Sequence, residues 1–561
     1  MDNPSANRIR LHVHLVMATV LRVLVCLLAA LALGPSRSAD AQTPRAEFRA
    51  VWVDTFNTRL ASAEDVALVL SRAASMRANA LFVQVRRRGD AWYLDSGEPL
   101  GDGLSPGFDP LAEVINQARG RGLQVHAFLT LGPVWNQAAA PTAPDHLFNT
   151  HGLGSGGAPE GRANWLTRTL APDGAETSYD GYRFGNDFWL DPAHPDVAAH
   201  LTEIVVRLAT RYPVDGIHLD RVQYPEVPGA SGPMTISVGY NPTAVARYNA
   251  RYDAAGVPVA NDGRFSAWRR EQVTNLLQRL YVSLLAVRPS LIVSAAVSAS
   301  GPAPGDFAAT EPYWRTFQDW QAWLETGAVD LVVPHVFRAE HTSAGAEAFA
   351  GWTMWARMSQ GRRAVVVGLG AYLNSVEGSV RQTRTVLQGG APSLAGVALF
   401  SVAANNAPVV SNPLSVPAGR DTPQRAIEDL ASGLRFGRTT TGLAVDPSLT
   451  GPFADVAEVP ALPWKREEGH VLGQLVDDRG APVDGVPVTL VRGAGTTQAT
   501  AVSDGTGVFA LPAVAPGAWR VVATVDGATY TSGCEVDVVA AGVARVTVAL
   551  ETSRPGVLEC R

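Results

Sequence analysis

The sequence has little cysteine and no excess of positive charge. Only 3 of its 561 residues are cysteine, and 46 Lys and Arg residues face 52 Asp and Glu residues, which gives a formal net charge of −6. This balance leaves no polycationic surface for nucleic acid phosphates, which argues against a nucleic-acid-binding protein. A content of 46% hydrophobic and 17% charged residues excludes a largely disordered, collagen-like or coiled-coil chain. Because 561 residues exceed what one hydrophobic core usually supports, we expect two folded units.

The sequence also lacks an apolar run long enough to span a membrane. The run at residues 23–33 is shorter than the ~20 residues of a membrane-spanning helix. Basic residues such as Arg8 and Arg10 precede it, and the small residues of Ala39-Asp40-Ala41 follow, as at a signal-peptidase site. We therefore expect residues 1–41 to be a removable export signal, with an uncleaved membrane anchor as the alternative. The mature protein would be periplasmic or extracellular, without stable membrane insertion.

Two cysteines remain after removal of the signal. Cys534 and Cys560 both lie near the C-terminus. In an exported protein this pair favours a disulfide that ties the tail to the last domain, and two free thiols are the alternative. Without histidine partners nearby, the pair is a poor zinc site.

The first folded unit is predicted to be an α/β domain. Short β-type runs alternate with longer amphipathic stretches, which is typical of strands and crossover helices in a parallel sheet. The eight runs are 48–54, 80–86, 123–128, 216–220, 291–296, 331–335, 364–369 and 397–401. Eight β/α units predict a TIM (β/α)8 barrel over residues 46–411.

The C-terminal part follows a different pattern. Residues 412–465 are rich in Pro, Ser, Gly and Thr, which indicates barrel trimming and a linker. Residues 466–552 contain short alternating strands with turn residues at regular intervals, which predicts a small all-β sandwich, and residues 553–561 form a tail.

Strand parity brings polar side chains together inside the barrel. Successive side chains of a strand point to opposite faces, so apolar Ile217 and Leu219 suit the helix-facing side and leave their neighbours pointing inward. An inward surface this polar does not suit a core, and the carboxyl ends of the strands are where TIM barrels carry their chemistry. The inward polar residues are Arg86, His126, His218, Asp220 and His335.

Long connections after the third and fourth strands would overhang the same face. They carry aromatic residues, among them Trp189 and Tyr224. Aromatic planes beside a polar cleft suit the C–H faces of sugar rings, and the alternative is that they only fix the loops in place. We therefore count Trp189 and Tyr224 as candidate substrate contacts.

Several of these segments occur in the order of a known family. They are 48–52, 79–86, 108–111, 122–127, 215–220 with Tyr224-Pro225, and 329–334. Together they resemble the glycosyl-hydrolase-like family 10, whose members are exported TIM barrels. Some bacterial members are implicated in cutting peptidoglycan glycan strands stripped of their peptides, so the resemblance implies a glycosidase acting on a polysaccharide, first of all peptidoglycan glycan. It implies no cofactor.

The last segment resembles a second family. Residues 473–477, 487–490, 504–509 and 516–517 are similar to the carboxypeptidase-regulatory-like sandwich that is appended to secreted enzymes. This resemblance implies a spacer or binding module without a catalytic residue.

Glycoside hydrolysis generally needs two carboxyl groups. Asp220 is the first candidate, with Arg86 as the cation expected to hold it ionised. Asp54, Asp90 and Glu226 are all placed on the same face; we favour Asp54 or Glu226 as the second catalytic carboxylate, and expect Asp90 to contact substrate. The histidines are either substrate contacts or hydrogen-bonded core residues.

Two other function classes stay open. His126, His218, Asp220 and His335 include the ligand types of a divalent metal site, as in a deacetylase or amidohydrolase, although strand one lacks the usual His-x-His pair. A polysaccharide-binding pseudoenzyme is the third reading, because Arg221 stands where family members often have a second acidic residue. The glycosidase hypothesis, which we favour, requires no metal.

Overall fold

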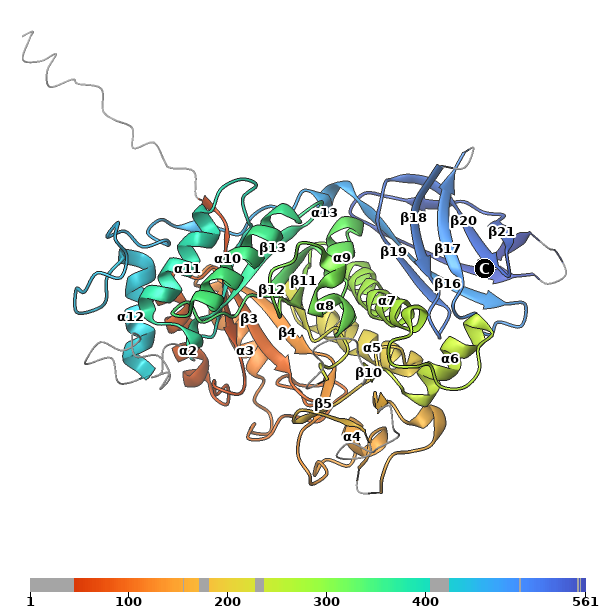
Figure 1. Cartoon of the computed structure of the whole chain (residues 1–561), viewed down its shortest axis with the longest axis horizontal. Coiled ribbons are helices and arrows are strands. Elements are labelled where there is room, and N and C mark those ends of the chain that lie inside the picture. The colour runs from red at the N-terminus through yellow and green to blue at the C-terminus, as the bar shows by residue number, and fades with distance from the viewer. Residues whose placement is uncertain are drawn as a thin grey trace, which may run out of the picture. The chain divides into compact units, whose positions relative to one another are not determined.

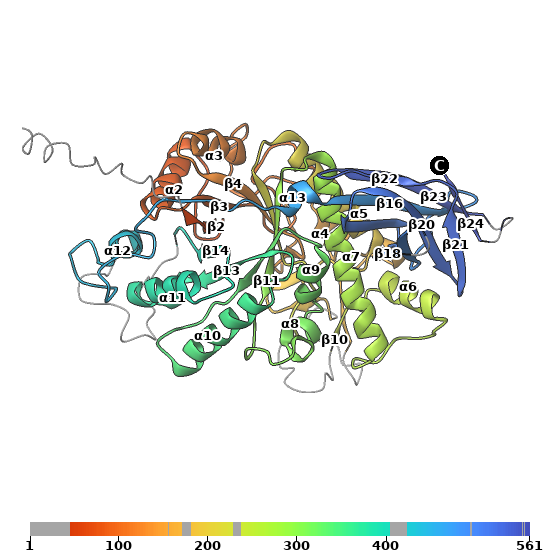
Figure 2. The same cartoon turned by 90° about the horizontal axis from the view of Figure 1, so that it is seen from above.

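Eight parallel strands close into a barrel at the centre of the computed structural model (Figures 1 and 2). The structure describes residues 45–154, 156–170, 181–227, 237–403, 423–493, 496–551, 554 and 556–561. The expected export signal at residues 1–41 lies outside these ranges. Among the described residues no helix is both long and apolar enough to cross a membrane.

The barrel strands are the eight that the sequence predicts. In barrel order they are β11 (Ile292–Ser298), β12 (Leu331–His335), β13 (Ala364–Gly370), β14 (Gly396–Phe400), β2 (Phe48–Val53), β3 (Ala80–Arg86), β4 (Gln124–Thr130) and β9 (Gly216–Asp220). β4 runs two residues past its predicted end at Phe128. The predicted TIM barrel is therefore confirmed.

Helices surround the barrel. They are α2 (Ala63–Ser75), α3 (Pro110–Arg119), α5 (Pro195–Arg211), α7 (Gly263–Val287), α9 (Trp320–Thr326), α10 (Ser343–Met358), α11 (Val376–Gln388) and α12 (Pro423–Phe436). Local sequence explains where they begin: the Asp109 side chain accepts the Ala112 N–H at 3.0 Å and Pro110 opens α3. Helix α6 (Pro242–Tyr252) and the four-residue helices α4 (Leu147–Thr150), α8 (Glu311–Trp314) and α13 (Trp464–Glu467) lie in the connections.

Helix α12 packs against the barrel, within the stretch predicted as barrel trimming and linker. Its apolar residues Ile427, Leu430 and Leu434 are buried in the main core, and Phe453 joins them. The main core therefore continues beyond residue 411 into the stretch predicted as barrel trimming.

The C-terminal strands form the expected β-sandwich. They are β16 (Gly469–Asp477), β17 (Pro487–Arg492), β18 (Thr496–Val502), β19 (Val508–Val514), β20 (Gly517–Val525), β21 (Ala528–Ser532), β22 (Val536–Val538), β23 (Val543–Leu550) and β24 (Val557–Cys560). Their order is β18-β17-β20-β21-β24-β23-β16-β19, with β22 on β20. Cys534 and Cys560 form a disulfide with their Cα atoms 6.2 Å apart, so β24 is tied to the loop before β22.

Ion pairs connect the sandwich to the barrel helices. Arg279 of α7 donates to Asp504 at 2.7 Å, and Arg247 of α6 donates to Asp484 at 2.6 Å. Residues 46–561 accordingly form one compact unit.

Candidate active site

A pocket of about 250 Å³ lies where β9, β11 and β12 end. It is lined by Asp220, Arg221, Gln223, Glu226, Ala296, Val297, Ser298, Ala299, Ser300, His335 and Arg338. Asp220, Ser298 and His335 are each the last residue of their strand, so the pocket opens on the carboxyl face of the barrel. Three sequence-predicted site residues meet here: Asp220, Glu226 and His335.

Asp220 ends a chain of hydrogen bonds that crosses three neighbouring strand ends. Its Oδ2 accepts from Thr130 Oγ1 at 3.3 Å, Thr130 Oγ1 accepts from Gln84 Nε2 at 3.1 Å, and Gln84 Oε1 accepts from the backbone N–H of Thr55 at 2.9 Å. Burial raises the pKa of Asp220, against the lowering effects of the Arg221 cation and the Thr130 hydroxyl. Asp220 is thus positioned by its neighbours and holds a proton more readily than an exposed carboxyl.

Arg221 lines the pocket beside Asp220, and Trp189 lies behind Arg221. Arg221 Nε lies 3.9 Å from Asp220 Oδ2, and the Arg221 guanidinium lies 5.8 Å from the Trp189 ring centre. Trp189, in β8 (Asp187–Trp189), covers Gly132, where an added Cβ would come within 2.4 Å of the indole. The Trp189 ring packs near the Arg221 guanidinium. Because Trp189 is only 4% exposed, it offers no open face for a sugar ring.

Arg86 does not pair with Asp220, so that prediction is wrong. Its Nε and Nη2 donate to the two carboxylate oxygens of Glu98 at 2.7 and 2.8 Å, and its Nη1 donates to the Thr130 carbonyl at 2.5 Å. Burial acts to raise the pKa of Glu98, but the Arg86 charge and a His200 hydrogen bond bring it to about 2. This fully buried pair stabilises the rim of the barrel and leaves Asp220 without a strong cationic partner.

His218 is a core residue. Trp52 Nε1 donates to His218 Nε2 at 3.2 Å, and His218 Nδ1 lies 2.8 Å from Ser294 Oγ. Since an indole N–H only donates, Nε2 carries no proton and Nδ1 donates to the serine. Burial lowers the pKa of His218 well below its usual value, so the ring is neutral and its nitrogens are occupied. The expectation of a substrate contact does not fit this environment.

His126 lies deeper in the barrel, whereas His335 faces the pocket. His126 is fully buried against Phe82 and fills the space that Gly216 leaves open, and burial lowers its pKa to about 4. Burial, together with Arg221, lowers the pKa of His335 to about 3, and His335 Nε2 has no hydrogen-bond partner among the described residues. Only His335 of these histidines is placed to meet a ligand.

The histidines and Asp220 do not assemble into a metal centre. Within the described ranges, no three His, Cys, Asp or Glu side chains are grouped as metal ligands. His126 and His218 are held apart from the pocket by their positions inside the barrel.

The two favoured candidates for the second catalytic carboxylate, Asp54 and Glu226, differ in their surroundings. Asp54 Oδ1 accepts from the backbone N and the side-chain Nδ2 of Asn57, each at 2.8 Å, and so fixes the turn after β2. Glu226 is exposed and lines the pocket. Of the two favoured candidates, only Glu226 shares the cavity with Asp220.

Asp90 and Tyr224 also have structural partners. Asp90 Oδ1 accepts from the backbone N of Arg88 at 2.8 Å, which holds the turn after β3. The Tyr224 hydroxyl is fully buried and donates to Asp191 at 3.1 Å. Neither lines the pocket, so their expected substrate contacts do not fit their positions.

The sequence did not indicate two residues of the site, Thr130 and Arg338. Thr130 continues the inward alternation of His126 and Phe128, but it falls beyond the predicted strand end. Arg338 lines the pocket and donates to the Gly301 carbonyl at 3.0 Å, and burial lowers its pKa. No pattern in the sequence indicated that Arg338 would turn back to this cavity.

Known protein families match both parts of the chain. The family described as glycosyl hydrolase-like 10 matches residues 47–383, and the carboxypeptidase regulatory-like domain matches residues 470–551. Glycosyl hydrolase DigH of Escherichia coli is 26% identical over 337 residues, covering 56% of this chain and 67% of that protein. Glycosyl hydrolase YngK of Bacillus subtilis is 21% identical over 362 residues, covering 60% of this chain and 62% of that protein.

The chain also matches several proteins of solved structure, two of which follow. The PgaB (BpsB) glycoside hydrolase domain of Bordetella bronchiseptica has a TM-score of 0.43 and 13% identity, covering 63% of this chain and 94% of that one. The endo-β-1,4-mannanase of Thermotoga petrophila has a TM-score of 0.40 and 12% identity, covering 90% of this chain and 99% of that one.

Proposed function

Because the chain belongs to the glycosyl hydrolase-like 10 family, we propose that it is an exported glycosidase that cuts a polysaccharide in the pocket beside Asp220. The proposed substrate is the glycan strand of peptidoglycan. This choice is supported by the family resemblance. The disulfide and the signal-like N-terminal sequence support export.

One observation carries the proposed chemistry: two carboxyl groups of unlike environment line a single cavity. Asp220 is buried and has a raised pKa, which suits a general acid, while Glu226 is exposed, which suits a base or nucleophile. Environments that differ in this way let one carboxyl donate a proton while the other accepts one or attacks.

The reaction steps follow from these roles. Asp220 donates its proton to the glycosidic oxygen as the bond between that oxygen and the anomeric carbon breaks. Glu226 either removes a proton from the water that attacks the anomeric carbon or attacks that carbon itself, with water completing the hydrolysis. The Thr130 hydroxyl holds the Asp220 carboxyl toward the pocket during transfer.

The test compares the chain from Gln42 onward with Asp220→Asn, Glu226→Gln and the matched control Asp54→Asn. Each is incubated with peptide-free and peptide-bearing peptidoglycan, chitin-type and plant-type polysaccharides, with and without a chelator. We expect chelator-insensitive release of reducing ends from peptide-free glycan strands, with losses of about 10²–10⁴-fold in the first two variants and little change in the control.

Other outcomes would contradict the proposal in distinct ways. Chelator-sensitive release of acetate would indicate a metal-dependent deacetylase. Tight binding of glycan without products would indicate a pseudoenzyme. Equal losses in Asp54→Asn and Asp220→Asn would refute the assignment of this cavity.

A further inference from the structure

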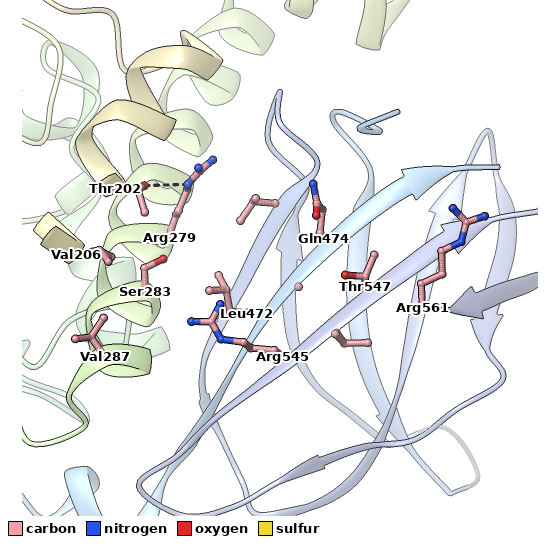
Figure 3. A pocket seen from close by; sticks show the side chains of 13 residues that line it. Thr202, Val206, Arg279, Ser283, Val287, Leu472, Gln474, Arg545, Thr547 and Arg561 are labelled. Atoms are coloured by element: carbon pink, nitrogen blue, oxygen red, sulfur yellow. Dashed lines mark hydrogen bonds between the residues drawn. The ribbon is translucent and has the colours of Figure 1, made fainter. Parts of the chain in front are cut away.

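A second hollow, of about 510 Å³, lies between the barrel helices α5 and α7 and the sandwich strands β16, β19 and β23 (Figure 3). It shares no residue with the pocket beside Asp220. Its volume falls within the ~300–1,000 Å³ range that is usual for small-ligand sites. Both the barrel and the sandwich contribute to its walls.

Positive charge distinguishes this hollow within a chain whose net charge is −6. Arg279, Arg545 and Arg561 line it, and no Asp or Glu is among the described residues of its wall. Arg561 has an acidic neighbour, since its Nε lies 3.6 Å from Glu559 Oε2. Arg279 is also engaged, because it donates to Asp504 at 2.7 Å and to Thr202 at 2.9 Å. Its role is to tie the sandwich to α7.

Arg545 has no such partner. It is exposed on β23 and makes no ion pair or side-chain hydrogen bond with any described residue. Figure 3 shows its side chain extending from the sandwich toward α7. A guanidinium in this position is free to bind an anionic group of a ligand.

Ser283 supplies a second, independent indication. It lies one helical turn after Arg279 on α7, lines the hollow and is only 6% exposed. Its hydroxyl makes no hydrogen bond to another side chain in the described part of the chain, so it is available to a ligand in the hollow. Gln474 and Thr547 add polar groups from the opposite wall, as Figure 3 shows.

We propose that this hollow binds a short oligosaccharide segment bearing carboxylate groups. Arg545 pairs with a sugar carboxylate, while Ser283, Gln474 and Thr547 bond to sugar hydroxyls. No aromatic side chain is among the described residues of the wall, so stacking contributes nothing and charge decides which sugars bind. The choice of a glycan as ligand rests on the proposed function, but binding at this site needs no hydrolysis.

The experiment uses titration calorimetry with trigalacturonic acid and its neutral methyl ester. The protein carries Asp220→Asn throughout, so that the probe is not cut. We expect the acid to bind and the ester to bind at least about fivefold more weakly. Arg545→Gln should weaken binding of the acid by a similar factor, and Ser283→Val should weaken it without changing the charge. Raising the salt concentration should weaken binding further.

Arg520→Gln is the matched control. Arg520 lies on β20, is about half exposed and does not line the hollow, so its loss should leave the affinity unchanged. Absence of binding by the acid, equal affinity for acid and ester, or equal effects of Arg545→Gln and Arg520→Gln would each overturn the proposal. Failure of the glycosidase assignment would leave this binding intact, which separates the two hypotheses.

Discussion

Replacing Asp220 with asparagine should strongly reduce activity and at the same time stabilise the protein. The Asp220 carboxyl is buried and its nearest cation, Arg221, is half exposed, so burial raises its pKa above the usual 3.8 despite the Arg221 charge. Each unit of that rise costs ~1.4 kcal/mol of folding free energy once the group ionises, because the folded state disfavours its charge. Asparagine keeps the shape and an oxygen that can accept from Thr130, but it carries no charge. The loss of the acid should lower kcat by about 10²–10⁴-fold.

The difference in stability between wild type and Asp220→Asn should depend on pH. Well below pH 3.8 the carboxyl is protonated in both the folded and unfolded states, so its charge contributes no difference in stability between wild type and Asp220→Asn. As the pH rises from 3.8 through the raised pKa of the folded state, the unfolded chain loses its proton first. Wild type therefore becomes less stable relative to the variant, and the difference levels off above the folded-state pKa.

Urea unfolding of both proteins across this pH range measures the difference. Glu226→Gln serves as the control, since Glu226 is exposed and its replacement should change activity without producing the same pH-dependent gain in stability. An Asp220→Asn variant that is less stable than wild type at pH 7, or that keeps its activity, would refute the reasoning.

Three further predictions follow from other contacts. Glu98→Gln leaves Arg86 buried without its carboxylate and should lower the free energy of unfolding at pH 7 by about 3–5 kcal/mol, measured by urea unfolding. Because the pKa of Glu98 is lowered to about 2, the contribution of Glu98 to stability is fully present above pH 4.5 and should decrease as the pH falls toward 2. Thr130→Val removes a hydroxyl that lowers the pKa of Asp220, so the alkaline limb of the pH–rate profile should move to higher pH, and an unmoved limb would contradict the assigned acid. Cys534→Ser opens a disulfide between residues 26 positions apart and should cost about 3.5 kcal/mol, seen by calorimetry as a lower melting temperature of the sandwich.

The barrel could be predicted because its strands leave a direct signal in the sequence. Each of the eight runs is apolar and β-type because both faces of a strand in this fold are buried, and all eight form strands. The position of α12 could not be predicted, since the stretch of Pro, Ser and Gly before it has the composition of a linker. Only the packing of Ile427 and Leu430 into the core shows that the domain continues.

Strand parity predicts the direction of a side chain but not its depth in the barrel. His126 and His218 point inward as expected, yet each is only the third residue of its strand and lies inside the barrel. Asp220 and His335 are the last residues of theirs and reach the pocket. Depth follows from register, because His126 pairs with Gly216 at the start of β9.

Register alone still does not decide which rim residue is free to act. Thr130 pairs with Asp220 across β4 and β9, so both lie in one layer at the carboxyl face. Arg86 also ends its strand, but the loop that follows folds back and places Glu98 against it, which removes its charge from the pocket. A charged residue at the rim therefore remains available for chemistry only where no loop supplies its counter-ion. Asp220 meets that condition, since its nearest cation, Arg221, stands 3.9 Å away and half exposed to solvent, where its charge is weakened by water.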